Sequence, residues 1–105
     1  DENNPNSGEL NVDLKISNSW DGGADYIITI TNNTSDEIIA WELIFESEVE
    51  FTSCYDAVLE KTDDGRFKIK SNQNSGVIEI NKSVQIKGQC KGYIDRIKNL
   101  SIRTW

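Results

Sequence analysis

The sequence predicts an all-β protein, a two-sheet antiparallel β-sandwich of the jelly-roll or immunoglobulin-like kind with eight or nine strands. Short stretches of alternating apolar and polar residues recur along the chain, and clusters of turn-forming residues separate them. No segment shows the apolar period of a helix, and no internal repeat is present. The apolar residues include no Met and are mainly Ile, Val and aromatic types, which suit the half-buried surface of a sheet.

The first three strands are expected over residues 9–17, 26–31 and 38–46. In the first, apolar residues occupy every second position from Val12 to Ile16, which is the period of a strand with one buried face. The second is rich in β-branched residues, which pack poorly in helices. The third places Trp41 in alternation with other large apolar residues, so it is expected to lie at the centre of the fold, with Trp41 in the core.

The middle strands are expected over residues 49–54, 58–59 and 67–69. The last two flank Thr62-Asp63-Asp64-Gly65, a cluster typical of a hairpin turn. A polar loop at 71–76 follows.

The closing strands are expected over residues 77–80, 83–87 and 100–102. Turn-forming Asn81-Lys82 separates the first two, and the third alternates apolar and polar residues near the end of the sequence.

One folded domain is expected over residues 9–105, because 105 residues supply enough chain for a single core. Residues 1–8 mix Asn, Ser, Pro and Gly without apolar periodicity, which is typical of a linker stub between domains. No stretch is apolar enough to span a bilayer. We expect the domain to be part of a larger secreted enzyme.

The charge of the chain restricts its partners. A formal charge of -7 and a pI near 4.5 repel phosphate backbones and anionic lipid, so nucleic acids and membranes are not expected to bind. Acidic polysaccharides are disfavoured for the same reason. Neutral glycans meet no such repulsion.

The composition also argues against catalysis. There is no His, which removes the commonest general base and the usual activation of a nucleophile. The 18 Asp and Glu residues leave carboxylate chemistry, but glycoside hydrolysis needs a deep cleft that a sandwich of this size rarely forms. Acidic pairs such as Asp63 and Asp64 are more simply turn residues. We therefore expect no catalytic residues.

No cofactor or metal is expected either. Cys54 and Cys90 are the only cysteines and cannot complete a zinc site without His. Oxygen ligands for calcium exist, for example Asp21, Asp25 and Asp63, but no loop has a diagnostic calcium spacing. The two cysteines form either a disulfide, which is the favoured expectation for a secreted domain, or two buried thiols.

Two aromatic residues fall where few apolar neighbours are available to cover them. Trp20 follows Asn18 in a polar turn region, and Tyr55 stands between Cys54 and Asp56 at the end of a strand. Exposed apolar area usually marks an interaction site. Sugar rings stack their C–H faces on flat aromatic rings, while their hydroxyls bond polar side chains at the edge. Trp20, Asn18 and Tyr55 therefore predict a sugar-binding surface.

At this point the chain resembles a known family, the family 2 carbohydrate-binding modules. The resemblance lies in six segments, which are 18–23 (NSWDGG), 28–33 (ITITNN), 39–45 (IAWELIF), 51–57 (FTSCYDA), 83–88 (SVQIKG) and 99–102 (NLSI). The resemblance implies a nine-stranded sandwich whose flat face of aligned aromatic residues lies against polysaccharide chains.

The resemblance also assigns residues. Trp20 matches the first binding Trp of the family, Tyr55 the second, and Asn18 a polar residue beside the first; Trp41 matches the core Trp. The third binding ring should fall near Gln73 and Asn74, where this sequence has no aromatic residue. Trp105 either extends the aromatic platform or caps the core. The family often joins its two ends by a disulfide, whereas Cys54 and Cys90 are internal and could link only neighbouring strands.

The function expected from the residues and the resemblance is a non-catalytic, monomeric binding module. It would target a plant cell-wall-degrading enzyme to a neutral β-glycan such as cellulose, mixed-linkage glucan, xyloglucan, glucomannan or xylan. Two alternatives stay open. One is a protein-interaction or adhesion module in which the same rings anchor a partner, and the other is a structural spacer in which other side chains cover them.

Overall fold

The computed structural model describes residues 10–105. The predicted linker stub at 1–8 and the expected first residue of the domain, Glu9, lie outside the described residues.

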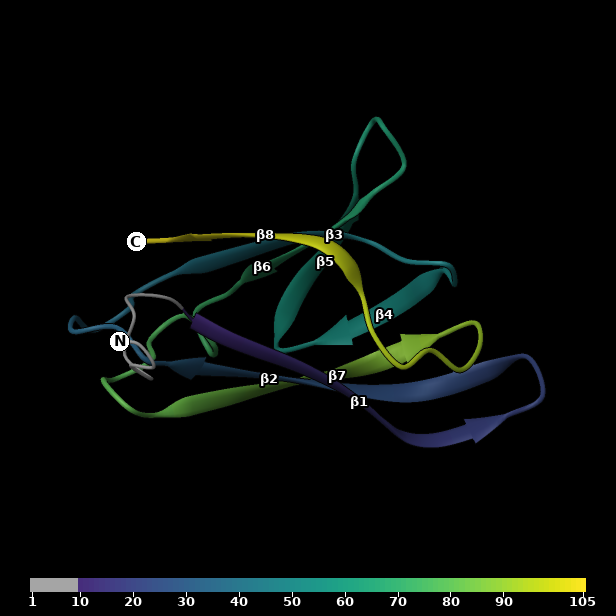
Figure 1. Cartoon of the computed structure of the whole chain (residues 1–105), viewed down its shortest axis with the longest axis horizontal. Coiled ribbons are helices and arrows are strands. Elements are labelled where there is room, and N and C mark those ends of the chain that lie inside the picture. Colours follow the sequence, from purple (N-terminus) through teal and green to yellow (C-terminus); the bar gives the residue numbers. More distant parts are fainter. Residues whose placement is uncertain (1–9) are drawn as a thin grey trace.

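Eight strands form two four-stranded antiparallel sheets, which confirms the predicted β-sandwich (Figure 1). The first sheet has the order β1-β2-β7-β4, and the second has the order β5-β6-β3-β8. The strands are β1 (Leu10–Trp20), β2 (Gly23–Asn32), β3 (Trp41–Glu46), β4 (Phe51–Tyr55), β5 (Ala57–Lys61), β6 (Phe67–Ser71), β7 (Ser83–Cys90) and β8 (Lys98–Thr104). The resemblance implied nine strands, and the described residues form eight.

The chain differs from the predicted strands at several places. Residues 38–40 precede β3, and 77–80 form no strand; Ile38 and Ile78 instead make one isolated bridge. The first strand is longer than predicted, because β1 pairs with β2 as far as Trp20 and Gly23. Gly22 closes this hairpin with φ 87°, a conformation that glycine adopts without steric cost.

The core lies between the facing surfaces of the two sheets. In β2, alternate residues from Ala24 to Ile30 are buried, and β3 contributes Leu43 and Phe45 from the other side. Trp41 is 1% exposed, and its indole Nε1 donates a 2.7 Å hydrogen bond to the Ser75 carbonyl. The prediction of Trp41 as a core residue is confirmed.

A buried tyrosine ties three strands of the first sheet together. Tyr26 of β2 passes beneath Gly88 of β7, and its hydroxyl donates a 2.7 Å hydrogen bond to the Ser53 carbonyl of β4. A Cβ on Gly88 would collide with both groups, so glycine is required here. The burial raises the pKa of Tyr26 far above its ordinary value, so the hydroxyl stays protonated.

Asn32 fastens the turn after β2. Its side chain is fully buried, donates to the carbonyls of Asp36 and Ile78, and accepts from the backbone N–H and the hydroxyl of Thr34. The turn-forming cluster predicted at 32–36 is therefore held by a satisfied amide inside the fold.

Candidate functional site

Trp20 and Asn18 project from the outer face of the first sheet because of a β-bulge. Val12 to Ile16 alternate toward the core, and strict alternation would also turn residue 20 inward. The register shifts between Ile16 and Asn18, so Asn18 pairs with Asp25 and Trp20 with Gly23. The bulge turns both side chains to the outside. The indole is 47% exposed and lies against Gly23, where a Cβ would come within 2.5 Å of its nitrogen.

Tyr55 reaches the same outer face through a second bulge. Phe51 is buried and pairs with Cys90, but the register shifts before Ser53, so Tyr55 pairs with the exposed Lys87. The phenol ring is 58% exposed. The two rings predicted to bind a ligand therefore lie on one face, each turned outward by an irregularity in its own strand.

A polar row crosses all four strands between the two rings. It consists of Asn18, Asp25, Gln89 and Ser53, which are successive cross-strand partners. The Gln89 amide donates to Asp25 Oδ1 at 3.2 Å, and the backbone N–H of Gln89 donates to Ser53 Oγ at 3.2 Å. The row supplies hydrogen-bonding groups in a line between the rings.

The outer face is shallow. A hollow of about 240 Å³ lies beside Tyr55, with Ile27 and Lys87 among its walls. From the strand spacing and the rise per residue, the two rings stand about 20 Å apart along a diagonal of the sheet. We call the area of Trp20, the polar row and Tyr55 the aromatic face.

Gln73 and Asn74 lie outside the aromatic face. They belong to the turn after β6, both are exposed, and the backbone N–H of Asn74 donates to Asn72 Oδ1 at 2.8 Å. Ser71 pairs with Ala57, which follows Tyr55 closely, so this turn is at the end of the sandwich opposite to the β1–β2 turn beside Trp20 (Figure 1).

Trp105 lies on the other side of the molecule. Leu43 and Ile102 pair and point inward, so Glu42 and its partner Arg103, and the next alternate residue Trp105, face outward from the second sheet. Its side chain is 57% exposed. Trp105 therefore neither caps the core nor extends the platform of Trp20.

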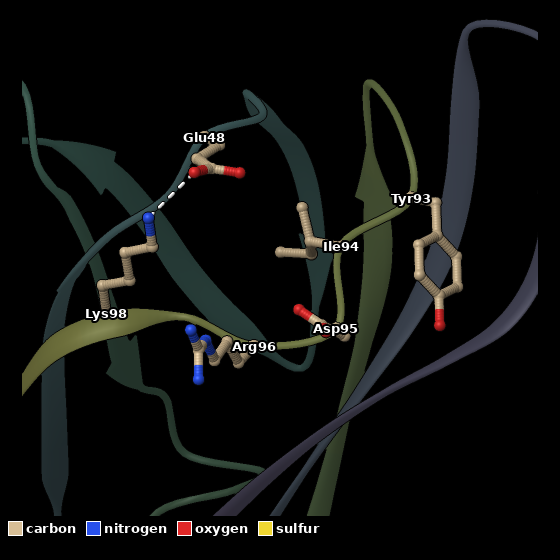
Figure 2. A pocket seen from close by; sticks show the side chains of 6 residues that line it. All are labelled: Glu48, Tyr93, Ile94, Asp95, Arg96 and Lys98. Carbon is tan, nitrogen blue, oxygen red and sulfur yellow. Dashed lines mark hydrogen bonds and ion pairs between the residues drawn. The ribbon is translucent and has the colours of Figure 1, made fainter.

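A further exposed ring, Tyr93, was missed by the sequence reasoning, although its place after Gly92 in the link from β7 to β8 was a usable signal. It is one of the residues that line a hollow of about 280 Å³, and in Figure 2 it stands on the side of the hollow opposite to an ion pair. That pair joins Lys98 and Glu48 at 2.8 Å, and the hydrogen bond from Lys98 lowers the pKa of Glu48. This hollow is lined mainly by charged side chains and lies apart from the aromatic face.

The two cysteines are free thiols, so the favoured expectation of a disulfide is wrong. Cys54 pairs with Gly88 and Cys90 with Phe51, so the two are offset diagonally across β4 and β7 rather than opposed. Diagonal neighbours are about 7–8 Å apart, beyond the Cβ spacing of a disulfide. Burial raises the pKa of both thiols.

Within residues 10–105 no group of three or more His, Cys, Asp or Glu side chains could hold a metal ion. The same part of the chain contains no helix long and apolar enough to cross a membrane.

Several solved structures resemble this fold. Chitinase ChiA74 from Bacillus thuringiensis matches with a TM-score of 0.79 and 23% identity over 88% of this chain, which corresponds to 15% of that chitinase. The chitin-binding domain of Chi18aC from Streptomyces coelicolor matches with a TM-score of 0.72 and 16% identity over 92% of each chain. The cellulose-binding family 2 carbohydrate-binding domain of ScLPMO10C matches with a TM-score of 0.69 and 14% identity, over 94% of this chain and 99% of that one.

These likenesses show the fold. No curated protein sequence matches the chain. The family model described as cellulose binding domain matches residues 10–97, which is most of the chain and includes Trp20, the polar row and Tyr55. The chain therefore belongs to this family, the family 2 carbohydrate-binding modules.

Proposed function

We propose that this chain is a non-catalytic module that binds a neutral β-1,4-linked polysaccharide through the aromatic face. Trp20 and Tyr55 would stack on sugar rings, and the polar row would bond the hydroxyls between them. The observation that carries the proposal is the pair of bulges, because each one turns an aromatic ring out of the core onto the same face. Bulges often re-aim side chains at functional sites.

The shape and charge of the module favour an extended, neutral polymer. The aromatic face is shallow, so a long chain can lie across it, whereas a small molecule would bury little of its surface. The charge of -7 opposes acidic polysaccharides. Two rings about 20 Å apart span several sugar units of one chain.

The ligand class follows from the family and its neighbours. The family is described as cellulose-binding, and two of the similar structures come from chitin-degrading or chitin-binding proteins. Cellulose and chitin share the β-1,4-linked backbone and the flat C–H faces that stack on aromatic rings. Cellulose, the other β-glucans and chitin are thus the candidates, and the module would bring a larger secreted enzyme to one of them.

The test is binding of wild type and Trp20→Ala to insoluble cellulose and chitin, with electrophoresis in gels containing mixed-linkage glucan, xyloglucan, glucomannan or xylan. We expect wild type to bind at least one polymer. Trp20→Ala should bind the same polymer at least about 10-fold more weakly, as is typical when an aromatic residue that anchors an interface is removed. Tyr93→Ala, which removes an exposed ring outside the aromatic face, is the matched control and should bind like wild type. Equal binding by wild type and Trp20→Ala would refute the site, and no binding to any polymer would favour a protein-interaction module.

A further inference from the structure

The outer face of the second sheet presents a second exposed indole on a fixed backbone. The backbone N–H of Trp105 donates to the Ala40 carbonyl at 2.9 Å, and the Trp105 carbonyl accepts from Ile39 at 2.8 Å. These bonds extend the β3–β8 pairing to Trp105. The Arg103 guanidinium lies 5.8 Å from the ring centroid, so the indole is held beside a cation while 57% of the residue stays exposed.

A buried carboxylate stands beside this ring. The Glu42 side chain is only 10% exposed, and among residues 10–105 the cation nearest to it is Arg103 at 3.8 Å, which is beyond hydrogen-bond distance. Within residues 10–105 no hydrogen bond to the Glu42 carboxylate is present. Buried acceptors are almost always hydrogen-bonded, because leaving one unpaired costs free energy. The carboxylate is therefore free to accept hydrogen bonds from solvent or from a bound molecule.

The ring and the carboxylate border one hollow of about 330 Å³, which Lys70 and Ser71 also line. Lys70 reaches Glu60 at 3.2 Å, and Ser71 Oγ accepts from the Trp41 backbone N–H at 3.0 Å. A flat apolar ring, an unpaired acceptor and a hydroxyl with donor capacity therefore meet in a space of the size that binds small ligands.

We infer that this hollow is a second sugar-binding subsite, which takes one neutral pyranose unit. The C–H face of the sugar would stack on the Trp105 indole, and its hydroxyls would donate to the Glu42 carboxylate. A neutral ligand rich in hydroxyls supplies the hydrogen-bond donors that this acceptor can use. The choice of a sugar rests on the proposed function, but the residues are on the opposite sheet, so the module would engage two polysaccharide chains at once.

The three tryptophans allow both sites to be followed in one experiment. Trp20 reports the aromatic face and Trp105 reports the second subsite, while Trp41, whose N–H is bonded inside the core, also borders the hollow. The measurement is the ¹⁵N–¹H signal of each indole during titration with cellohexaose and with chitohexaose. We expect the Trp20 and Trp105 signals to move with separate saturation curves for at least one of these sugars.

Variants connect the Trp105 response to the carboxylate. Glu42→Leu removes the acceptor and should weaken the Trp105 response about 10-fold while leaving the Trp20 response unchanged. Glu42→Gln keeps an acceptor oxygen at the same place and should retain part of the response. Ser101→Ala, an exposed position on the same sheet that does not line the hollow, is the matched control. Dispersed backbone ¹⁵N–¹H signals show that each variant is folded.

The outcomes separate the two proposals. If only Trp20 responds, the second subsite is wrong and the proposed function stands. If only Trp105 responds, the aromatic face is wrong and the subsite stands; if neither responds to either sugar, both are wrong. A Trp105 signal that moves with protein concentration rather than with sugar would overturn the subsite in favour of a contact between copies of the chain.

Discussion

The Trp20 indole lies so close against Gly23 that a Cβ on this glycine would come within 2.5 Å of the indole nitrogen. Gly23 is the cross-strand partner of Trp20. Because Gly23 has no side chain, the indole can pack directly against the backbone of the sheet. The direction of the ring therefore depends on a residue that would contribute no group of its own to a ligand.

Gly23→Ala should weaken polysaccharide binding without unfolding the domain, because the added methyl group would clash with the Trp20 indole and displace it. We expect a loss of about 10-fold, measured as retention on the polymer that wild type binds. Gly22→Ala is the control. A methyl group at Gly22 meets nothing within 4 Å, so binding should stay intact. The residue has φ +87°, which is strained for alanine, so the variant should lower the free energy of unfolding by about 1 kcal/mol. Unchanged binding in Gly23→Ala would show that the ring position does not matter.

Tyr55→Ala should reduce binding less than Trp20→Ala, because a phenol ring offers a smaller stacking surface than an indole. Tyr55 is 58% exposed, so its removal should change the melting temperature little. Tyr93→Ala removes an equally exposed phenol elsewhere and should leave affinity unchanged. Equal losses in both tyrosine variants would point to a non-specific effect of surface aromatics.

Asn32→Ala should destabilise the domain strongly. The variant removes the acceptor of the Thr34 backbone N–H and one of the two donors to each of the carbonyls of Asp36 and Ile78, and losing the partner of a buried polar group costs about 1–3 kcal/mol. We expect a loss of about 2 kcal/mol or more in the free energy of unfolding by urea. Asn33→Ala, whose side chain makes no hydrogen bond to other residues of 10–105, should change it by about 0.5 kcal/mol or less. If Asn32→Ala changed the free energy of unfolding as little as Asn33→Ala, water would be replacing the Asn32 amide.

Both cysteines should react with a thiol reagent only after unfolding. In the native protein, burial raises the pKa of Cys54 and Cys90, so at neutral pH little reactive thiolate is present. Protein purified without reductant should show no fast reaction when native and two thiols per chain in denaturant. If no thiols reacted in denaturant, Cys54 and Cys90 would be joined by a disulfide after all.

The sandwich could be predicted from the sequence because alternation marks strands directly. The buried position of Trp41 followed from its register with Leu43 and Phe45, and the structure confirms it. The end of β7 at Cys90 was not predicted, because Gly88 breaks the apolar pattern; it belongs to the strand since the Tyr26 ring occupies the space of its side chain.

The pattern of residues in each strand does not show that Trp20 and Tyr55 share one face, which the resemblance to the family implied. Strict alternation from Ile16 would point Trp20 inward, and alternation from Phe51 would do the same to Tyr55. The bulges that reverse both directions depend on pairing with β2 and β7, which a local pattern does not contain. For the same reason, the sequence pattern did not predict on which face Trp105 lies, because that depends on pairing with the distant strand β3.

The strand order has a consequence for how the chain reaches this structure. Strand β7 lies between β2 and β4, yet the 27 residues of 56–82 separate it from the end of β4 along the chain. The β1–β2 hairpin can close early, but the free edge of β2 must wait until β7 has been synthesised. Non-local pairing of this kind makes folding slow, on the order of milliseconds to seconds. During that interval an unpaired, Ile-rich edge is open to association with other chains, so we expect folding aids to act on this domain before β7 docks.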